Sequence, residues 1–125
     1  MIVLDASALL AFLFRETGHE KVAAHLANSL LSTVNLSEVL GRFARDGHDP
    51  LPVLAKIDRS PIGIVAFSSE HAARAAALIP QTSHLGLSMG DRACLALALS
   101  QGLPALTADR VWSKLDVGVE VTLVR

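Results

Sequence analysis

Four acidic residues lie near the starts of predicted helices, where a fold could gather them: Asp5, Glu38, Asp91 and Asp109. They follow apolar runs or open helical patterns, and such strand-to-helix transitions meet at one edge of a parallel sheet. Two carboxylates ~4 Å apart repel by about 4 kcal/mol at an effective dielectric of ~20, and a bound divalent cation turns this repulsion into coordination. Oxygen ligands favour Mg²⁺ or Mn²⁺ over Zn²⁺, which prefers His and Cys. The sequence therefore predicts a site for a hard metal ion.

Each acid also has a purely structural explanation. Asp5 could be the N-cap of the helix that follows it, and Asp109 could shape a turn. The other two acids could close capping boxes with a polar residue three positions earlier, Asn35 with Glu38 and Ser88 with Asp91. These alternatives stay open for each acid taken alone, whereas convergence of all four would favour the metal site.

Five arginines lie on segments that flank the predicted site and could bind phosphate: Arg15, Arg42, Arg45, Arg92 and Arg110. The formal net charge of the chain is −1, which becomes +3 when the four acids are left out. This balance favours a polyanionic substrate that is bound locally rather than by a global basic excess. Alternatively, Arg42 and Arg45 only solvate the outer face of their helix or pair locally with Glu38 and Asp46. The five histidines show no ligand spacing, and we expect nearly all of them at the surface.

Short β-type runs alternate with helical patterns along the chain, which predicts an α/β fold with a central parallel sheet of four to five strands. Strands are expected at residues 1–4, 30–33, 63–67, 103–107 and 119–124. Helices are expected at residues 6–14, 19–28, 35–46, 50–59, 68–79 and 88–100, with a helical turn at 111–114 and a loop at 80–87. The segment 91–100 is apolar on nearly every side, so we expect it inside the molecule or in a subunit interface.

The chain has 125 residues, of which 51% are hydrophobic and 18% charged, so we expect one folded domain over residues 1–125. Its one cysteine, Cys94, excludes an intrachain disulfide and fits a reducing cytoplasm; its apolar surroundings predict a core position.

No basic leader precedes the apolar N-terminus, and no apolar run reaches the roughly 20 residues that span a bilayer. We therefore expect neither a signal peptide nor a membrane span. With 4% aromatic residues, base stacking is not expected to dominate nucleic-acid binding.

Four segments together resemble the PIN-domain family, specifically the VapC-type toxins of prokaryotic toxin–antitoxin pairs: IVLDASALLAF, TVNLSEVL, GLSMGDRACLALAL and ALTADRVW. Their order and spacing extend the resemblance over almost the whole chain. The resemblance implies a PIN-like three-layer fold and an endoribonuclease that depends on Mg²⁺ or Mn²⁺. It also implies a homodimer and a cognate VapB-type antitoxin that inhibits the enzyme with an extended segment across the active groove.

The same resemblance assigns roles to particular residues. The acidic positions of the family correspond to the four acids named above, as catalytic residues and metal ligands, and its polar positions correspond to Ser7, Asn35 and Thr107. We expect Asp5 and Asp91 to be the central ligands, with Glu38 and Asp109 completing the coordination directly or through water.

Two other interpretations remain. One is an RNA- or partner-binding module with negligible cleavage, which a turnover assay distinguishes from an enzyme. The other is a receiver or phosphatase-like α/β domain. It fits less well, because the first strand is not followed by a D-x-D pair and no lysine stands in an obvious strand-end position.

Overall fold

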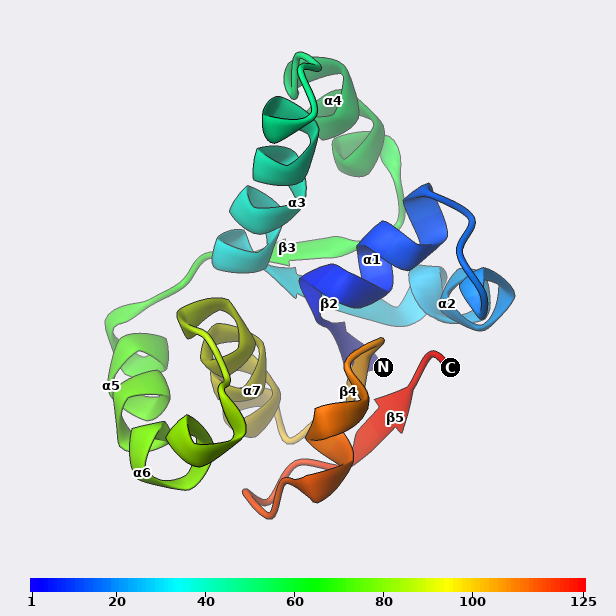
Figure 1. The fold of residues 1–125 in the computed structure, drawn as a ribbon. Helices are drawn as coiled ribbons and strands as arrows, with labels where there is room; N and C mark the ends of the chain where they lie inside the picture. Colours follow the sequence, from blue (N-terminus) through cyan, green and yellow to red (C-terminus); the bar gives the residue numbers. More distant parts are fainter.

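Five short strands form one parallel sheet at the centre of the fold (Figure 1). The structure is a computed structural model that describes residues 1–125. The strands lie in the order β3-β2-β1-β4-β5, with bounds β1 Ile2–Leu4, β2 Ser29–Ser32, β3 Gly63–Val65, β4 Ala105–Thr107 and β5 Val121–Leu123. Every neighbouring pair is parallel. The α/β fold predicted from the sequence is confirmed, and only β2 begins outside its predicted segment, by one residue.

Seven α-helices and three 3₁₀ helices connect the strands. The α-helices are α1 Ala6–Leu13, α2 His19–His25, α3 Thr33–Arg45, α4 Leu51–Arg59, α5 Ser69–Ala77, α6 Ile79–Thr82 and α7 Met89–Gln101. The 3₁₀ helices are η1 Leu26–Asn28, η2 Ser83–Leu85 and η3 Arg110–Lys114.

Two of the predicted element boundaries are wrong. The expected loop at 80–87 contains α6 and η2, which are too short to give a periodic signal; Pro80 stands in the first turn of α6, a position that favours helix. The third helix begins at Thr33 rather than Asn35, because the Ser32 hydroxyl caps it by accepting a hydrogen bond from the Val34 amide at 3.2 Å. Asn35 therefore lies inside α3 and is not its cap.

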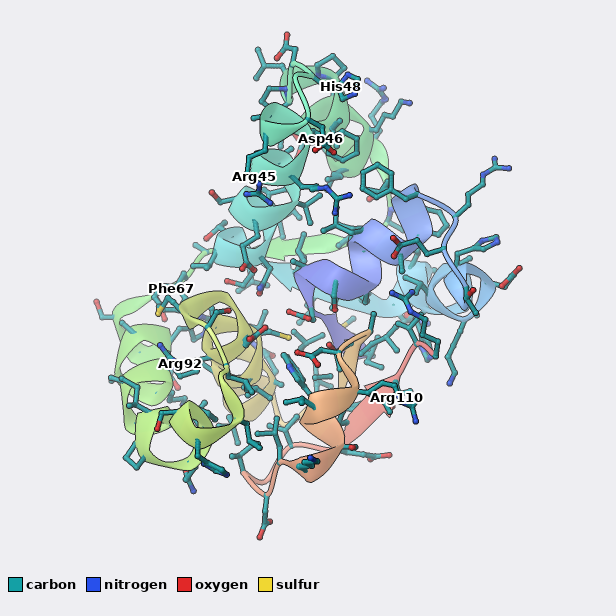
Figure 2. The ribbon with its side chains drawn as sticks, in the orientation of Figure 1. Arg45, Asp46, His48, Phe67, Arg92 and Arg110 are labelled. Atoms are coloured by element: carbon teal, nitrogen blue, oxygen red, sulfur yellow. The ribbon has the colours of Figure 1, made fainter.

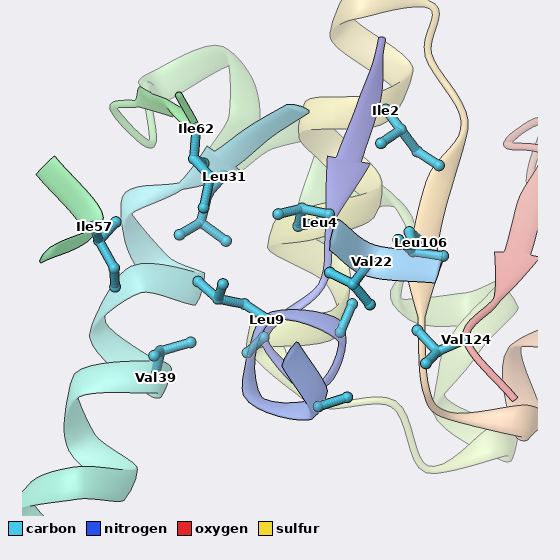
Figure 3. Packing of buried hydrophobic residues seen from close by; sticks show 13 residues of the cluster. Ile2, Leu4, Leu9, Val22, Leu31, Val39, Ile57, Ile62, Leu106 and Val124 are labelled. Carbon is cyan, nitrogen blue, oxygen red and sulfur yellow. The ribbon is translucent and has the colours of Figure 1, made fainter. Parts of the chain in front are cut away.

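Helices cover both faces of the sheet and give three layers, with α1 to α4 on one face and α5 to α7 with η3 on the other (Figure 1). Within β1, Ile2 and Leu4 belong to the hydrophobic cluster of the first face, whereas Val3 belongs to that of the second. Figure 3 shows the first cluster, to which Leu9 of α1 and Val39 of α3 contribute. Burial of both faces explains why the strands read as continuous apolar runs.

The apolar helix α7 is buried within the chain itself. Every residue from Ala93 to Ala98 is buried, between the sheet and α5. Of the two places expected for this helix, the interior of the molecule is therefore the observed one, and its composition needs no subunit interface. Cys94 lies in this core as predicted, and burial raises the pKa of its thiol well above the ordinary value.

The order of the strands creates a crevice at the carboxyl ends of β1 and β4. The chain moves outward from β1 to β2 and β3, and then returns to place β4 on the other side of β1. Such a reversal of direction is where ligands bind in open α/β sheets. No helix of the structure has the length and apolarity that a membrane crossing requires.

Candidate active site

The four predicted acids line a single cavity of about 230 Å³ at this crevice, together with Ala6, Ser7, Leu10 and Arg45. Asp5 directly follows β1, and Asp109 lies two residues beyond β4. Glu38 belongs to α3 and Asp91 to the first turn of α7. Because α7 follows η2 and not a strand, the expectation that all four acids sit at strand-to-helix transitions is wrong for Asp91.

Asp5 is held by two hydroxyl groups from opposite ends of the sequence. Ser7 Oγ donates to Asp5 Oδ2 at 2.6 Å, and Thr107 Oγ1 donates to the same oxygen at 2.9 Å. Each hydroxyl in turn accepts a backbone N–H, Ser7 from Ala108 at 2.9 Å and Thr107 from Asp109 at 3.1 Å. The orientation of both hydroxyls is thereby fixed toward Asp5, which ties β1 to the segment after β4.

Asp5 is 3% exposed, and this burial raises the pKa of its carboxyl from 3.8 to about 7. The hydrogen bonds from Ser7 and Thr107 oppose the rise, whereas the charges of Asp91 and Glu38 add to it. Burial also raises the pKa of Glu38; the hydrogen bond from Asn35 opposes this and the charge of Asp91 increases it. The acids of the cavity therefore repel one another, and a cation would relieve that repulsion.

Glu38 is placed by a contact between α3 and α7. The buried Asn35 amide nitrogen donates to Glu38 Oε1 at 2.8 Å and to the carbonyl oxygen of Gly90 at 2.9 Å. A Cβ atom built at Gly90 would overlap the Glu38 carboxylate. Gly90 therefore leaves the space that the carboxylate occupies. Sequence reasoning missed this residue, although a glycine directly before Asp91 in the first turn of a helix was a visible signal.

Two of the four acids cap helices as well as lining the cavity. Ser88 and Asp91 form the expected capping box, in which Asp91 Oδ2 accepts the Ser88 amide at 2.8 Å. Asp109 Oδ1 caps η3 by accepting the Val111 amide at 3.0 Å. Asp5 stands at the N-cap position of α1 but makes no capping bond. The expected capping box of Asn35 with Glu38 is wrong, since both residues lie inside α3.

In each carboxylate, one oxygen accepts these positioning hydrogen bonds and the other accepts none from the protein. The oxygens without a protein donor are Asp5 Oδ1, Glu38 Oε2, Asp91 Oδ1 and Asp109 Oδ2. Four such oxygens in one cavity suit a hard divalent cation such as Mg²⁺, which takes carboxylate and water ligands. No three His, Cys, Asp or Glu side chains are grouped closely enough to hold a metal ion as they stand. The chemistry of the donor set fits the metal, while its spacing is looser than a closed coordination shell.

The structure separates the five predicted arginines. Only Arg45 lines the cavity of the acids. The other four lie elsewhere. Arg42 pairs with Asp46 at 3.1 Å and lies over the Phe14 ring. Arg92 donates to the Leu87 carbonyl, and Arg110 donates to the Arg125 carbonyl. Arg15 lies two residues beyond the end of α1 and has a positive φ of 52°. Figure 2 shows Arg45, Arg92 and Arg110 on separate elements.

No histidine lines the cavity. Four of the five lie at least partly at the surface, and His71 is buried, where it accepts a hydrogen bond from the Ser68 amide at 3.4 Å.

Comparison with known proteins agrees with this architecture. Residues 2–118 match the PIN domain, and the chain therefore belongs to the PIN-domain family. A search of curated protein sequences finds no significant match.

Several solved structures share the fold at low sequence identity. A toxin–antitoxin complex from Klebsiella pneumoniae is similar with a TM-score of 0.75 and 17% identity, covering 100% of this chain and 98% of that chain. The DNA-bound VapBC of Salmonella typhimurium matches with a TM-score of 0.73 and 15% identity over 100% of both chains. VapC20 of Mycobacterium tuberculosis, a toxin that cleaves the sarcin–ricin loop, matches with a TM-score of 0.72 and 16% identity, covering 96% and 99%. The predicted resemblance to the PIN family and to the fold of VapC-type toxins is confirmed.

Proposed function

We propose that the protein is a metal-dependent endoribonuclease that hydrolyses RNA phosphodiester bonds, acting as the toxin of a VapBC-type pair. The observation that carries this proposal is the set of four carboxylates around one cavity, each with one oxygen free of protein donors. Membership of the PIN-domain family supports the nuclease class.

The residues have distinct parts in this chemistry. Asp5 and Asp91 are the central ligands for Mg²⁺ or Mn²⁺, and Glu38 and Asp109 complete the set. Ser7 and Thr107 fix the Asp5 carboxylate, and Asn35 fixes that of Glu38. When bound, the cation supplies charge neutralisation for the phosphate and lowers the pKa of a water molecule.

Hydrolysis then needs no nucleophile from the protein. The water oxygen forms a bond to phosphorus and gives up a proton, while the bond from phosphorus to the departing ribose oxygen breaks and that ribose oxygen takes up a proton. Cys94 is buried in the core and no histidine lines the cavity, which agrees with water as the nucleophile. The cavity also contains no lysine, so a receiver-type site is not favoured.

Two partners belong to the proposal. Several similar structures are toxin–antitoxin complexes, which supports a VapB-type antitoxin as the inhibitor of this chain. A homodimer follows from the family resemblance alone, since α7 is buried within the chain. Sedimentation of the purified protein tests it, and a monomer that persists at all concentrations would exclude it.

Cleavage itself is tested with the partner-free protein on total cellular RNA, with mapping of the cut sites. We expect discrete cuts in Mn²⁺ or Mg²⁺ that are abolished by EDTA and by Asp5→Asn. Cleavage that persists in excess EDTA would exclude the metal mechanism. The spacing of the acids, which is looser than a closed shell, is the one observation that favours the second candidate, a binding module with negligible turnover. RNA binding without any cuts would support that candidate.

A further inference from the structure

A second hollow continues from the cavity of the acids along α3 and the start of α7. We call it the α3–α7 groove; its volume is about 570 Å³, and it is lined by Thr33, Val34, Ser37, Gly41, Ser88 and Met89, among others. Glu38 and Arg45 line both the groove and the cavity of the acids. An RNA strand whose cleaved bond lies at the acids can therefore extend into the groove.

The hydroxyl groups of the groove are arranged as donors. Thr33 Oγ1 accepts the Phe67 amide at 3.1 Å, and Ser88 Oγ accepts the Asp91 amide at 3.2 Å. Since a backbone N–H already occupies an acceptor site on each, the hydroxyl hydrogen of each remains to donate to a ligand. Ser37 is exposed and its hydroxyl makes no hydrogen bond within the protein. Donors of this kind suit an anionic oxygen.

Arg45 is the cation of the groove. It forms no salt bridge, whereas Arg42 of the same helix is held by Asp46. The Arg45 side chain lies back along α3 over Gly41. A Cβ atom added to Gly41 would stand 3.7 Å from Nη1 of Arg45. Long side chains lean toward the N-terminus of their helix, which here brings the guanidinium to the boundary between the two hollows.

We infer that the α3–α7 groove binds the nucleotides that flank the cleaved bond, with Arg45 as the cation for a phosphate beside the acids and the hydroxyls of Thr33 and Ser88 as donors to oxygens elsewhere along the groove. The inference rests on the proposed function, because it takes the acids as the site of cleavage. A volume of about 570 Å³ falls within the range of pockets that hold small organic ligands and accommodates a nucleotide. Arg45 and the donors then favour RNA that extends beyond the cleaved dinucleotide unit.

The test measures binding of labelled oligoribonucleotides to the full chain, and every protein in it carries Asp5→Asn to prevent cleavage. In this background, Arg45→Gln should weaken binding of a hexanucleotide about tenfold and reduce the slope of log affinity against log salt by about 0.7, the loss of one phosphate contact. Binding of a dinucleotide should change less. Unchanged hexanucleotide affinity and salt slope would overturn the inference.

Gly41, which lines the groove but is not one of the acids, offers a matched pair of variants. Gly41→Glu should weaken hexanucleotide binding at least tenfold more than Gly41→Gln, because the two side chains differ in charge but hardly in size. Equal effects of the two variants would contradict a phosphate subsite. If hexanucleotide binding depends on Arg45 and on the charge at position 41 but the wild-type protein cuts no RNA, the proposed nuclease fails and the groove stands. If the wild-type protein cuts RNA in a metal-dependent way but hexanucleotide binding is unaltered in these variants, the proposed nuclease stands and the phosphate subsite in the groove fails.

Discussion

The Glu38 carboxylate occupies the space that a side chain at residue 90 would need. Asn35 joins the two residues by donating to both, so α3 and α7 are fixed relative to each other at the edge of the cavity. One of the four acids is therefore placed by a contact between two helices, made by residues that lie 55 positions apart in the chain.

Gly90→Ala should force the Glu38 carboxylate out of its position. We expect a loss of about 1–3 kcal/mol in the free energy of unfolding, as in other overpacked sites, and at least a tenfold loss of RNA cleavage. Chemical denaturation and a cleavage assay measure the two effects. In a Glu38→Ala background the same substitution should cost nothing, because the overlapping group is gone. Equal destabilisation in both backgrounds would show that the contact is not the cause.

Thr107→Val removes one of the two hydroxyl donors to Asp5 with little change in shape. Because this hydrogen bond lowers the pKa of Asp5, its loss should raise that pKa further and move the acid limb of the pH–rate profile to higher pH. Thr107→Ser keeps the donor and should leave the profile near that of the wild type. A valine variant whose profile coincides with that of the serine variant would argue against the hydroxyl's role.

Asp5→Asn should stabilise the metal-free protein at neutral pH. The pKa of Asp5 is raised from 3.8 to about 7 on folding, so the carboxyl favours the folded state below pH 4 and loses this contribution as the pH rises to about 7. The difference corresponds to about 4 kcal/mol at 1.36 kcal/mol per pKa unit. The melting temperature of the variant should exceed that of the wild type at pH 8 in EDTA, by a margin that shrinks toward pH 5. A margin that is independent of pH would count against the buried charge.

Cys94→Ala should leave RNA cleavage unchanged and cost about 1 kcal/mol of stability through the small cavity it creates. The thiol is buried and its pKa is raised, so iodoacetamide should not inactivate the native wild-type protein. Loss of activity in a folded Cys94→Ala variant, or rapid inactivation by the reagent, would contradict water as the nucleophile.

The order of strands and helices could be predicted from the sequence because local patterns determine most of it. Residues 2–4 and 105–106 are apolar whichever face of the sheet they lie on, and capping residues such as Ser68 and Ser88 mark the starts of their helices. The pieces that sequence reasoning missed, α6 and η2, span four and three residues and give no periodic signal. The place of α7 could not be predicted, because an apolar helix has the same sequence pattern in a core and in a subunit interface.

The identity of the acids could also be predicted, but not the contacts that position them. The hydroxyl pair of Ser7 and Thr107 on Asp5 depends on the β1–β4 pairing, which joins residues about a hundred positions apart. Likewise, the sequence does not distinguish Arg45 from Arg42, although only Arg45 reaches the cavity, since Phe14 and Asp46 hold Arg42. Such choices depend on tertiary packing.

The central claim is that the four carboxylates act together as one site for a divalent cation. Titration of Mn²⁺ into the purified protein, followed by electron paramagnetic resonance of the free ion, tests it most directly. We expect saturable binding by the wild type that is lost in Asp5→Asn and in Asp91→Asn, while Asp58→Asn, an acid outside the cavity, binds like the wild type. Equal Mn²⁺ binding by all four proteins, or none by the wild type, would contradict the account.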